Sequence, residues 1–471
     1  MLDAVKTPLM GADPVCLLTS ADLAQAYADA TLSPVDVARR ALERADEVNE
    51  RLNAFTFIDY DGALAAARAS EDRWRAGTQL SPVDGVPATI KDIVAIKGWS
   101  VRYGSAVTPR GIGTEDAPSV ARLRAAGLVF LGATITPEFG WKALTDSPAF
   151  GITRNPWNAG VTPGGSSGGA AVAAATGAGV FHLGSDGGGS IRVPAAFTGI
   201  CGIKPTFGRV AAYPASPFGT VAHIGPMCRN ATDTEVMLGL MSGRDQADWF
   251  QGVATFPDLA PHGMSPQAKR IGVWRRPPSG TVESIVAAQF EASLADLAAA
   301  GAELVEVDLP MGDALLEIFN WHWICGARRR LDMLGEVDTS KLDPGLFEMA
   351  EQARDWRASD YIAHVNLRAA FGSAMDRLLG GLDYLVSPAT AVLPFAAGCE
   401  VPPGSGLSRW IEWAGFSYPI NLSQQPAVSV PAGLSAGGLP HSLQIIAGRG
   451  KDSTVMAFAK WWEGRHPEYF L

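Results

Sequence analysis

The sequence has few of the features that mark a secreted, metal-binding or zinc-containing protein. Its five cysteines are odd in number and widely spaced, and none forms a C-x-x-C motif, which argues against a disulfide framework and a zinc site. The seven histidines form no H-E-x-x-H motif and no cluster with cysteine, so metal-assisted hydrolysis lacks its ligands. We therefore expect no metal and no cofactor.

Runs of positive charge and long apolar runs are also missing. Asp and Glu number 48 against 38 Lys and Arg, a net charge of −10, which argues against nucleic acid and anionic membranes as partners. The longest apolar run, AAVAAATGAGVF, is too short to cross a bilayer. The start, MLDAVKTPLMGADPV, lacks the pattern of a signal peptide. We expect a cytoplasmic protein, monomeric or homodimeric, that acts on a small molecule.

What is present is an alternation of helical patterns and short apolar strands. Thr19 or Ser20 is expected to cap a first helix, and Ser33 followed by Pro34 to open a second. A buried strand is predicted at 86–90, and others in the segments LVFLGAT, GVFHLGSD, KRIGVW, LDYLVSPAT and PAVSVPAG. This alternation predicts an α/β sandwich. Residues 240–380 are richer in helical patterns and are expected to form an excursion from the core sheet.

Glycine and serine are concentrated in one segment, TPGGSSGGAAVAAATGAGVFHLGSDGGGSIRVPAAF, at 162–197. A glycine-rich loop before a helix can bind phosphate through its N–H groups and the helix dipole. A P-loop, however, needs Lys and then Ser or Thr after its last glycine, whereas GGSSGG is followed by Ala170 and Ala171. The dinucleotide motif G-x-G-x-x-G fails as well, because His182 occupies its third glycine position. Both phosphate interpretations are weak.

A nucleophilic serine is the alternative. GGSSG matches the G-x-S-x-G elbow, which also requires a downstream Asp and His, and nothing around His441 or His466 indicates catalysis. Ser190 follows a predicted strand and three glycines, and consecutive glycines can direct N–H groups at a developing oxyanion. Where no histidine is placed, lysine is the known substitute as base.

Lys91 is a candidate for that base because it follows the apolar stretch VPATI. A lysine in water has a pKa of about 10.4 and is protonated near neutral pH. Full burial disfavours the charged form and lowers the pKa enough to allow a neutral amine. Judged by itself, Lys91 is one lysine among several, and most lysines are exposed. From the residues alone the assignment stays open.

The segment GGSSGGAAVAAATGAGVFHLGSDGGGSIRVPAAFTGICGIKPTFGRV resembles the signature of the amidase signature family, the Ser-Ser-Lys amide hydrolases. The segments PVDGVPATIKDIVAIKGWSVRYGS, FGITRNPWN, HIGPMCRNATD and INLSQQPAVSVPAGLSAGGLPHSLQIIAG resemble further motifs of that family. The resemblance covers most of 18–240 and 380–460. It implies one domain over 1–471, built on a mixed central β-sheet between helices. Residues 241–379 are then a variable, mainly helical excursion that forms part of the substrate cleft.

The resemblance implies a role for each residue of the glycine–serine segment. Ser190 is the expected nucleophile, Lys91 the base, and Ser166 the bridging serine, which in this family sits at a cis peptide bond. The expected oxyanion hole consists of backbone N–H groups, those of Gly187, Gly188, Gly189 and Ser190. Structural support is expected from Ser167, Asp186 and Arg192.

The resemblance also bears on the substrate. The glutamine-dependent amidotransferase branch has an acidic residue where this chain has Ala414, so an apolar substrate is favoured over free glutamine. Aromatic residues nearby predict an aryl or alkyl amide, as in aryl acylamidases, or a carbamate, as in urethanases. The alternatives are an allophanate or biuret hydrolase and the glutamine-type amidotransferase. The expected substrate-binding residues are Phe139, Trp141, Leu144, Trp410, Trp413 and Phe416, with Trp321 and Trp323 in the variable part.

Overall fold

One mixed sheet of eleven strands organises the part of the chain that the computed structural model describes, residues 12–252, 256, 259 and 263–471. The strand order is β1-β3-β2-β6-β8-β7-β12-β13-β11-β9-β10. Parallel pairs join β2 to β3 and β6, and β9 to β10 and β11, whereas the other neighbours run antiparallel. The strands are β1 (Phe55–Ile58), β2 (Pro87–Lys91), β3 (Val129–Thr134), β6 (Phe181–Asp186), β7 (Cys201–Lys204), β8 (His223–Cys228), β9 (Arg270–Val273), β10 (Glu303–Glu306), β11 (Tyr384–Pro388), β12 (Ala427–Leu434) and β13 (Pro440–Ile446), with β4 (Asp146–Ser147) and β5 (Gly151–Ile152) in a separate hairpin.

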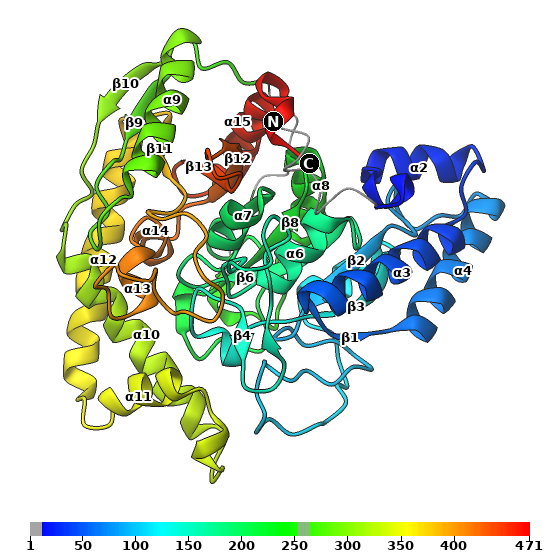
Figure 1. The fold of residues 1–471 in the computed structure, drawn as a ribbon, viewed down its shortest axis with the longest axis horizontal. Coiled ribbons are helices and arrows are strands. Elements are labelled where there is room, and N and C mark those ends of the chain that lie inside the picture. Colours follow the sequence, from blue (N-terminus) through cyan, green and yellow to red (C-terminus); the bar gives the residue numbers. More distant parts are fainter. Residues whose placement is uncertain (1–11, 253–255, 257–258, 260–262) are drawn as a thin grey trace.

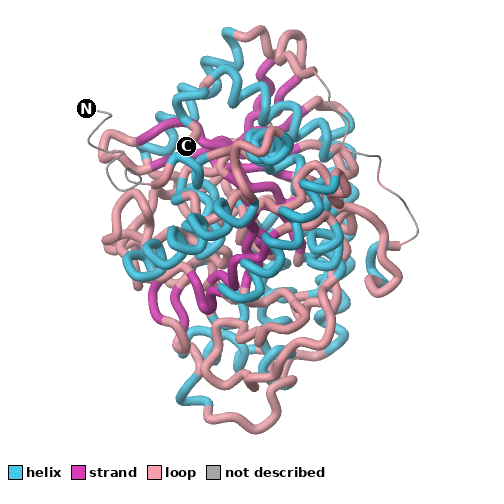
Figure 2. The backbone as a smooth tube through the Cα atoms, turned by 90° about the vertical axis from the view of Figure 1, so that its right-hand side faces the viewer, coloured by secondary structure: helices cyan, strands magenta, loops and turns pink. Residues whose placement is uncertain are grey.

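Helices cover this sheet on both faces, as Figure 2 shows. The α-helices are α2 (Ser20–Ala28), α3 (Pro34–Leu52), α4 (Tyr60–Ala76), α5 (Pro118–Ala125), α6 (Gly168–Thr176), α7 (Arg192–Thr198), α8 (Ala231–Met241), α9 (Ser284–Ala299), α10 (Ala314–Asp332), α11 (Pro344–Gln352), α12 (Ala358–Gly380), α13 (Trp410–Trp413), α14 (Tyr418–Ser423) and α15 (Asp452–Arg465). Short 3₁₀ turns are η1 (Pro14–Leu17), η2 (Glu138–Gly140), η3 (Gly219–Val221), η4 (Trp249–Gln251), η5 (Thr339–Lys341) and η6 (Pro467–Tyr469). The predicted α/β sandwich with a mixed central sheet is confirmed.

The N-terminal helices begin where their capping residues predict. Thr19 caps α2 and forms a capping box with Asp22, because each side chain satisfies a backbone N–H of the other. Ser33 caps α3, and Pro34 occupies its first turn, where a missing N–H costs nothing. Asn53, in the left-handed conformation, ends α3. Local sequence signals therefore determine this part of the fold.

The two faces of the sheet can be read from adjacent residues of β8. Cys228 packs with residues of α5, α8 and α15, whereas Met227 packs with the alanines of α6 and α7. Successive side chains of a strand point to opposite faces, so α8 and α15 lie on one side of the sheet and α6 and α7 on the other. The layers place the starts of α6 and α7 directly beside the central strands.

Small residues let α6 approach the sheet closely. Every residue of α6 is buried, and its sequence is GGAAVAAAT. A Cβ atom on Gly169 would lie 2.5 Å from the carbonyl oxygen of Ala54 and 2.5 Å from the backbone nitrogen of Ile135. Such contacts with backbone atoms cannot be relieved by a side-chain rotation. Glycine at this position therefore fixes how α6, and the loop before it, sit on the sheet.

The topology gathers three loops at one edge of the sheet. Strands β2 and β6 are parallel neighbours, so Lys91 at the end of β2 and Asp186 at the end of β6 lie at the same edge. The glycine loop that follows β6 leads to Ser190 and then into α7. Ser166 and Ser167 precede α6. This edge is where open α/β sheets carry their sites.

The segment 241–379 contributes both to the sheet and to its surroundings. Strands β9 and β10 extend the sheet at one end, far from β1. Figure 1 shows α2 to α4 on the side of β1, and α10 to α12 on the opposite side of the molecule, with α10 and α11 below β9 and β10 in this view. The region is thus helical for the most part, with two strands that the core sheet includes.

None of the helices within the described ranges is long and apolar enough to cross a membrane. All five cysteines fall within those ranges and are free, and Cys16, Cys201 and Cys228 are buried.

The close contact between α6 and the sheet can be tested by its effect on stability. Gly169→Ala is expected to lower the free energy of unfolding by about 1–3 kcal/mol, because overpacking against backbone forces shifts. Gly372→Ala is the control, since a Cβ atom there, inside α12, meets nothing within 4 Å; it should stabilise by about 0.5–1 kcal/mol. Urea denaturation followed by circular dichroism measures both. Equal effects of the two substitutions would contradict this account of α6.

Candidate active site

Lys91 is the centre of a cluster of hydroxyl groups. Its side chain is buried, with 0% exposure, and its nitrogen Nζ lies within hydrogen-bond distance of three serine Oγ atoms. The distances are 2.7 Å to Ser166, 2.9 Å to Ser167 and 2.9 Å to Ser185. The three hydroxyls come from a loop and a strand that lie far from Lys91 in the sequence. They fix the lysine nitrogen at the edge of the sheet.

The surroundings of Lys91 favour its neutral form. Burial lowers the pKa of the Lys91 amine well below its ordinary value, and the nearby carboxylate of Asp186 acts in the opposite direction. Loss of water disfavours the charged ammonium form, and hydrogen bonds to neutral hydroxyls offset this cost only in part. A neutral amine can accept a proton from a hydroxyl within hydrogen-bond reach. The geometry therefore makes Lys91 a candidate base and Ser166 its nearest proton donor.

Ser166 and Ser190 are brought together by two loops. The peptide bond between Gly165 and Ser166 is cis, as the family resemblance implies. The N–H of Ser167 donates to the carbonyl oxygen of Ser190 at 3.2 Å, which ties the loop before α6 to the loop before α7. Both Ser166 and Ser190 line the same cavity. Within the described part of the chain, Ser190 Oγ makes no hydrogen bond to Ser166.

Gly187 and Ser190, at the two ends of the glycine loop, line the cavity. The N–H of Gly189 donates to the carboxylate of Asp186 at 2.8 Å, so this N–H is engaged within the protein. Those of Gly187, Gly188 and Ser190 have no acceptor among the described residues. Of the four expected oxyanion donors, three are thus free to bind a ligand. The N–H of Gly189 instead shapes the loop.

Glycine is required in this loop by its neighbours. A Cβ atom on Gly187 would lie 2.9 Å from the Trp323 ring, and one on Gly188 would lie 2.9 Å from the Phe319 ring. Gly189 has a φ of 120°, a conformation that other residues rarely adopt. Close packing under the loop and its backbone conformation together explain the run of three glycines.

A buried ion pair braces the loop from below. Arg192 donates to both carboxylate oxygens of Asp186, at 2.9 and 3.0 Å, and both side chains are fully buried. Arg192 also donates to Asn421 at 2.6 Å and to Gln444 at 2.7 Å. Burial by itself would raise the pKa of the Asp186 carboxyl, but the charge and hydrogen bonds of Arg192 lower it overall. This network fixes the carboxylate that holds the Gly189 N–H.

A second buried lysine lies behind the brace. Lys204 donates to the carbonyl oxygens of Pro205, at 3.2 Å, and Gln425, and its Nζ lies 3.4 Å from Nε2 of His223. Burial, together with the charge of Arg192, lowers its pKa, whereas Asp186 and Asp452 act in the opposite direction. Burial and then the charge of Lys204 lower the pKa of His223, which lines the cavity. His223 is therefore neutral near pH 7.

The cavity in front of the two serines has a volume of about 280 Å³. It lies between the edge of the sheet, the loop 211–218 and helix α10. Its wall is mostly apolar, and its larger side chains are Tyr103, Phe139, Tyr213, Phe218, Trp323 and Arg330.

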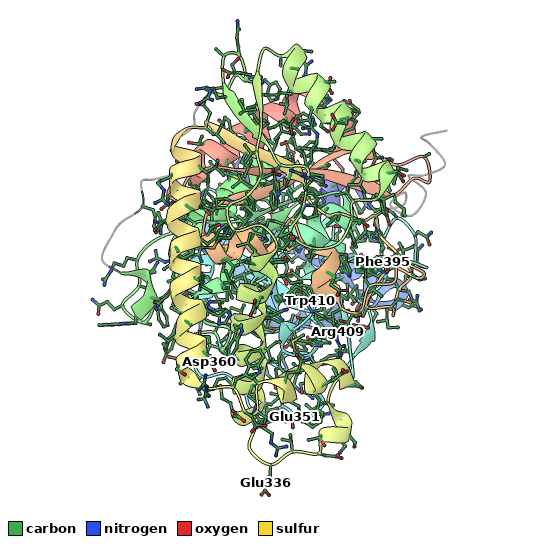
Figure 3. The ribbon with its side chains drawn as sticks, turned by 90° about the vertical axis from the view of Figure 1, so that its left-hand side faces the viewer. Glu336, Glu351, Asp360, Phe395, Arg409 and Trp410 are labelled. Carbon is green, nitrogen blue, oxygen red and sulfur yellow. The ribbon has the colours of Figure 1, made fainter. Side chains whose placement is uncertain are left out.

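The structure separates the six expected substrate-binding residues into two groups. Phe139 lines the cavity. The other five are buried in the core behind it and do not form its wall: Trp141, Leu144, Trp410, Trp413 and Phe416. Figure 3 shows Trp410 beside Arg409 on the side of the molecule formed by α10 to α12. Trp413 stacks on Phe197, and Phe416 packs edge-on against Trp274. Core packing, rather than contact with the cavity, accounts for these five positions.

Several residues of the site could not be predicted, because they belong to no recognisable sequence motif. Ser185 supplies the third hydroxyl that contacts Lys91. The one sequence signal for this contact is its place near the end of the predicted strand that becomes β6, a neighbour of β2. Tyr213 and Phe218 come from a loop without a recognisable pattern, and Arg330 from the variable helix α10. Trp323, expected only as part of the variable region, lines the cavity, whereas Trp321 stacks on His364 away from it. No cluster of three or more potential metal ligands occurs in the described ranges.

Comparisons with known proteins agree with the fold. The family model described as Amidase matches residues 36–456. An acylamidase from Rhodococcus erythropolis is 33% identical over 458 residues, 96% of this chain and 96% of the relative. A glutamyl-tRNA(Gln) amidotransferase subunit from Acidothermus cellulolyticus is 33% identical over 462 residues, 91% of this chain and 90% of the relative.

The solved structure of a bacterial aryl acylamidase of the amidase signature family superimposes with a TM-score of 0.89 and 26% identity, over 97% of this chain and 98% of that one. The chain therefore belongs to the amidase signature family. It is an amide C–N hydrolase of that type.

The buried brace predicts a large effect on stability. Arg192→Met is expected to lower the free energy of unfolding by about 3–5 kcal/mol, because it leaves the Asp186 carboxylate buried without its partner. Arg276→Met is the control: Arg276 pairs with Asp308, and both side chains are exposed, at 79% and 66%, so the change should stay below about 1 kcal/mol. Urea unfolding of the two variants measures the difference. A loss in Arg192→Met no larger than in the control would refute the bracing role.

Proposed function

We propose that the protein hydrolyses amides with Ser190 as nucleophile, Ser166 as proton relay and Lys91 as general base. The observation that carries this proposal is the 2.7 Å hydrogen bond between Lys91 Nζ and Ser166 Oγ in a fully buried setting. Burial keeps the amine neutral, and the hydrogen bond gives it a route to the cavity. Ser190 lines the same cavity as Ser166 and follows the glycine loop.

The steps follow from these positions. Ser190 Oγ attacks the substrate carbonyl while its proton passes to Ser166, and the proton of Ser166 passes to the Lys91 amine. The negative oxygen that develops is stabilised by the free N–H groups of Gly187, Gly188 and Ser190, which costs no reorganisation. Lys91 then returns its proton through Ser166 to the leaving nitrogen. Water releases the acid from Ser190 by the same relay.

The substrate class that fits the wall is an amide with an apolar or aromatic part. Aromatic rings and small apolar residues form most of the cavity, and an acylamidase and an aryl acylamidase are among the similar proteins. A carbamate presents the same type of carbonyl to Ser190, so we include aryl carbamates among the proposed substrates. The C–N bond is cleaved in both cases.

Glutamine is the alternative substrate, because subunits of glutamyl-tRNA(Gln) amidotransferases are also similar to this chain. Against it stands the apolar residue Ala414, which is buried, at the position of an acidic residue in that branch. None of the described residues that line the cavity has a carboxylate to bind an ammonium group. We therefore propose that apolar amides are better substrates than glutamine, and better than the small polar molecules allophanate and biuret.

We also propose that the chain forms one amidase domain over 1–471, in which 18–240 and 380–460 form the catalytic core. The segment 241–379 then supplies part of the cleft. Support comes from the continuous sheet, which includes β9 and β10, and from Trp323, Arg330 and Met333 in the cavity wall. Differences in this segment between relatives would change the substrate without altering the relay.

A substrate panel tests the proposed function. Wild-type protein should release amine from anilides and from small aryl carbamates faster than it releases ammonia from glutamine. Ser190→Ala should reduce each hydrolysis at least about a thousandfold, as loss of a nucleophile does. Ser373→Ala changes a serine on α12 outside the cavity wall and should leave the rates unchanged. Hydrolysis that survives in Ser190→Ala would refute the assignment of the nucleophile, and a preference for glutamine would favour the amidotransferase alternative.

A further inference from the structure

Arg330 is the one residue with an ionised side chain at neutral pH among the described residues that line the cavity. It lies in the last turn of α10, in the variable part of the chain. The other polar groups of the wall are hydroxyls, the imidazole of His223 and backbone. A single cation in an otherwise uncharged cavity gives that cavity a positive potential, even though the protein has a net charge of −10.

Among the residues that the structure describes, the Arg330 guanidinium has no anionic partner. No carboxylate of the described chain forms an ion pair with Arg330, and its Nε is buried without a hydrogen-bond acceptor. Burial lowers the pKa of Arg330, while Tyr103 acts in the opposite direction. Taking a charged group out of water without a partner is costly. A ligand that supplies an acceptor would recover that cost.

Two aromatic residues hold the guanidinium in place. Its carbon Cζ lies 4.1 Å from the centre of the Tyr103 ring and 4.4 Å from that of Phe139. Both residues have a positive φ, 57° and 54°, and the N–H of Phe139 donates to the carbonyl oxygen of Tyr103 at 2.7 Å. Such backbone is unfavourable for bulky residues and persists where the surroundings fix it, often at functional sites.

The same segments connect Arg330 to the reacting groups. Asp92, the residue after Lys91, accepts the N–H groups of Arg102 and Gly104 and so holds the turn that contains Tyr103. Gly140, the residue after Phe139, is so near Ser166 that a Cβ atom on it would lie 3.3 Å from Ser166 Oγ. The segment of Phe139 and Gly140 therefore contacts the guanidinium at one residue and lies beside Ser166 at the next.

We infer that Arg330 binds a carboxylate of the amide substrate, and that the preferred substrate has this carboxylate but no ammonium group beside it. The inference rests on the proposed function and names its substrate class. A guanidinium binds a carboxylate through two parallel hydrogen bonds. The cavity wall has no carboxylate in its described part to pair with an ammonium group, so a zwitterionic substrate would leave its positive charge without a partner. The carboxylate belongs either to the acyl part or to the amine part.

Matched pairs of anilides distinguish these two positions. N-Phenylglutaramate has the carboxylate in the acyl part, and 4-acetamidobenzoate has it in the amine part. In each control molecule an acetyl group replaces the carboxylate and retains its shape without the charge. The wild-type enzyme should have a higher kcat/KM for one of the two carboxylates than for its ketone. Equal values within both pairs would overturn the inference.

Two arginine variants separate binding from structure. Arg330→Gln should lower kcat/KM for the preferred carboxylate about tenfold to a hundredfold, since a hydrogen bond to a charged group is lost. It should leave the matching ketone nearly unchanged. Arg329→Gln changes the exposed neighbour on the same helix and should alter neither. Equal losses on carboxylate and ketone in Arg330→Gln would show a merely structural role and overturn the inference.

γ-Glutamylanilide differs from N-phenylglutaramate by an added ammonium group. It should be the poorer substrate, and the reverse order would overturn the part of the inference that concerns the ammonium group.

An equilibrium measurement keeps this test independent of catalysis. The Ser190→Ala protein should bind N-phenylglutaramate or 4-acetamidobenzoate in calorimetry, and the further change Arg330→Gln should weaken that binding about tenfold or more. If the wild-type enzyme cleaves none of the anilides, the proposed function fails. The binding experiment still tests whether Arg330 binds a carboxylate. Equal affinities of the two proteins would overturn the inference.

Discussion

The desolvation of one lysine is the constraint on which the rest of the site depends. Lys91 lies at the end of β2 with its amine in contact with three serine hydroxyls and no water-exposed surface. An amine in that setting is neutral at a pH where an exposed lysine is protonated. In the proposed mechanism, this neutral lysine serves as the base, and no histidine is needed. The surrounding fold supplies the three hydroxyls that contact the amine.

The small residues and the ion pair near Lys91 have separate structural tasks. Glycine at 169 lets α6 approach the backbone of the sheet, and this sets the position of the loop that contains Ser166. The pair of Asp186 and Arg192 holds the Gly189 N–H and leaves the remaining N–H groups of the glycine loop for a ligand. The residues of the proposed relay thus lie on the core sheet and on the loops at its edge. The wall of the cavity, by contrast, comes in part from α10, which is free to vary without disturbing it.

Sequence patterns predict much of the fold, and fail where contacts join distant segments. Caps and apolar runs predict α2, α3, β3 and β6 closely, and place β2 within one residue of its observed start. They do not predict β7, β8 and β13, because antiparallel pairing inside a mixed sheet leaves no local period in such short, largely buried stretches. The role of Ser185 depends on the alignment of β6 with β2, which only the sheet topology determines.

The predicted substrate contacts show the same limit. Aromatic residues near a motif can pack in the core as readily as they line a cavity, and five of the six candidate positions pack behind it. Arg330 has no sequence signal, since an arginine on an amphipathic helix is ordinarily exposed. Its isolation in the cavity is visible only once the neighbours of α10 are known. Ser166 and Ser190, in contrast, are expected from one long motif, and Lys91 from a separate segment that resembles the same family.

Direct observation of the charge on Lys91 tests this account most sharply. Protein labelled with ¹³C at the lysine Cε position can be titrated by nuclear magnetic resonance, and the signal that disappears in Lys91→Met assigns the residue. Because burial lowers the pKa of Lys91 below its ordinary value of 10.5, its signal should have the chemical shift of a neutral amine at pH 7.5. It should change to that of an ammonium only as the pH falls, together with the rate of amide hydrolysis. A signal that remains that of an ammonium up to the ordinary pKa would contradict the account.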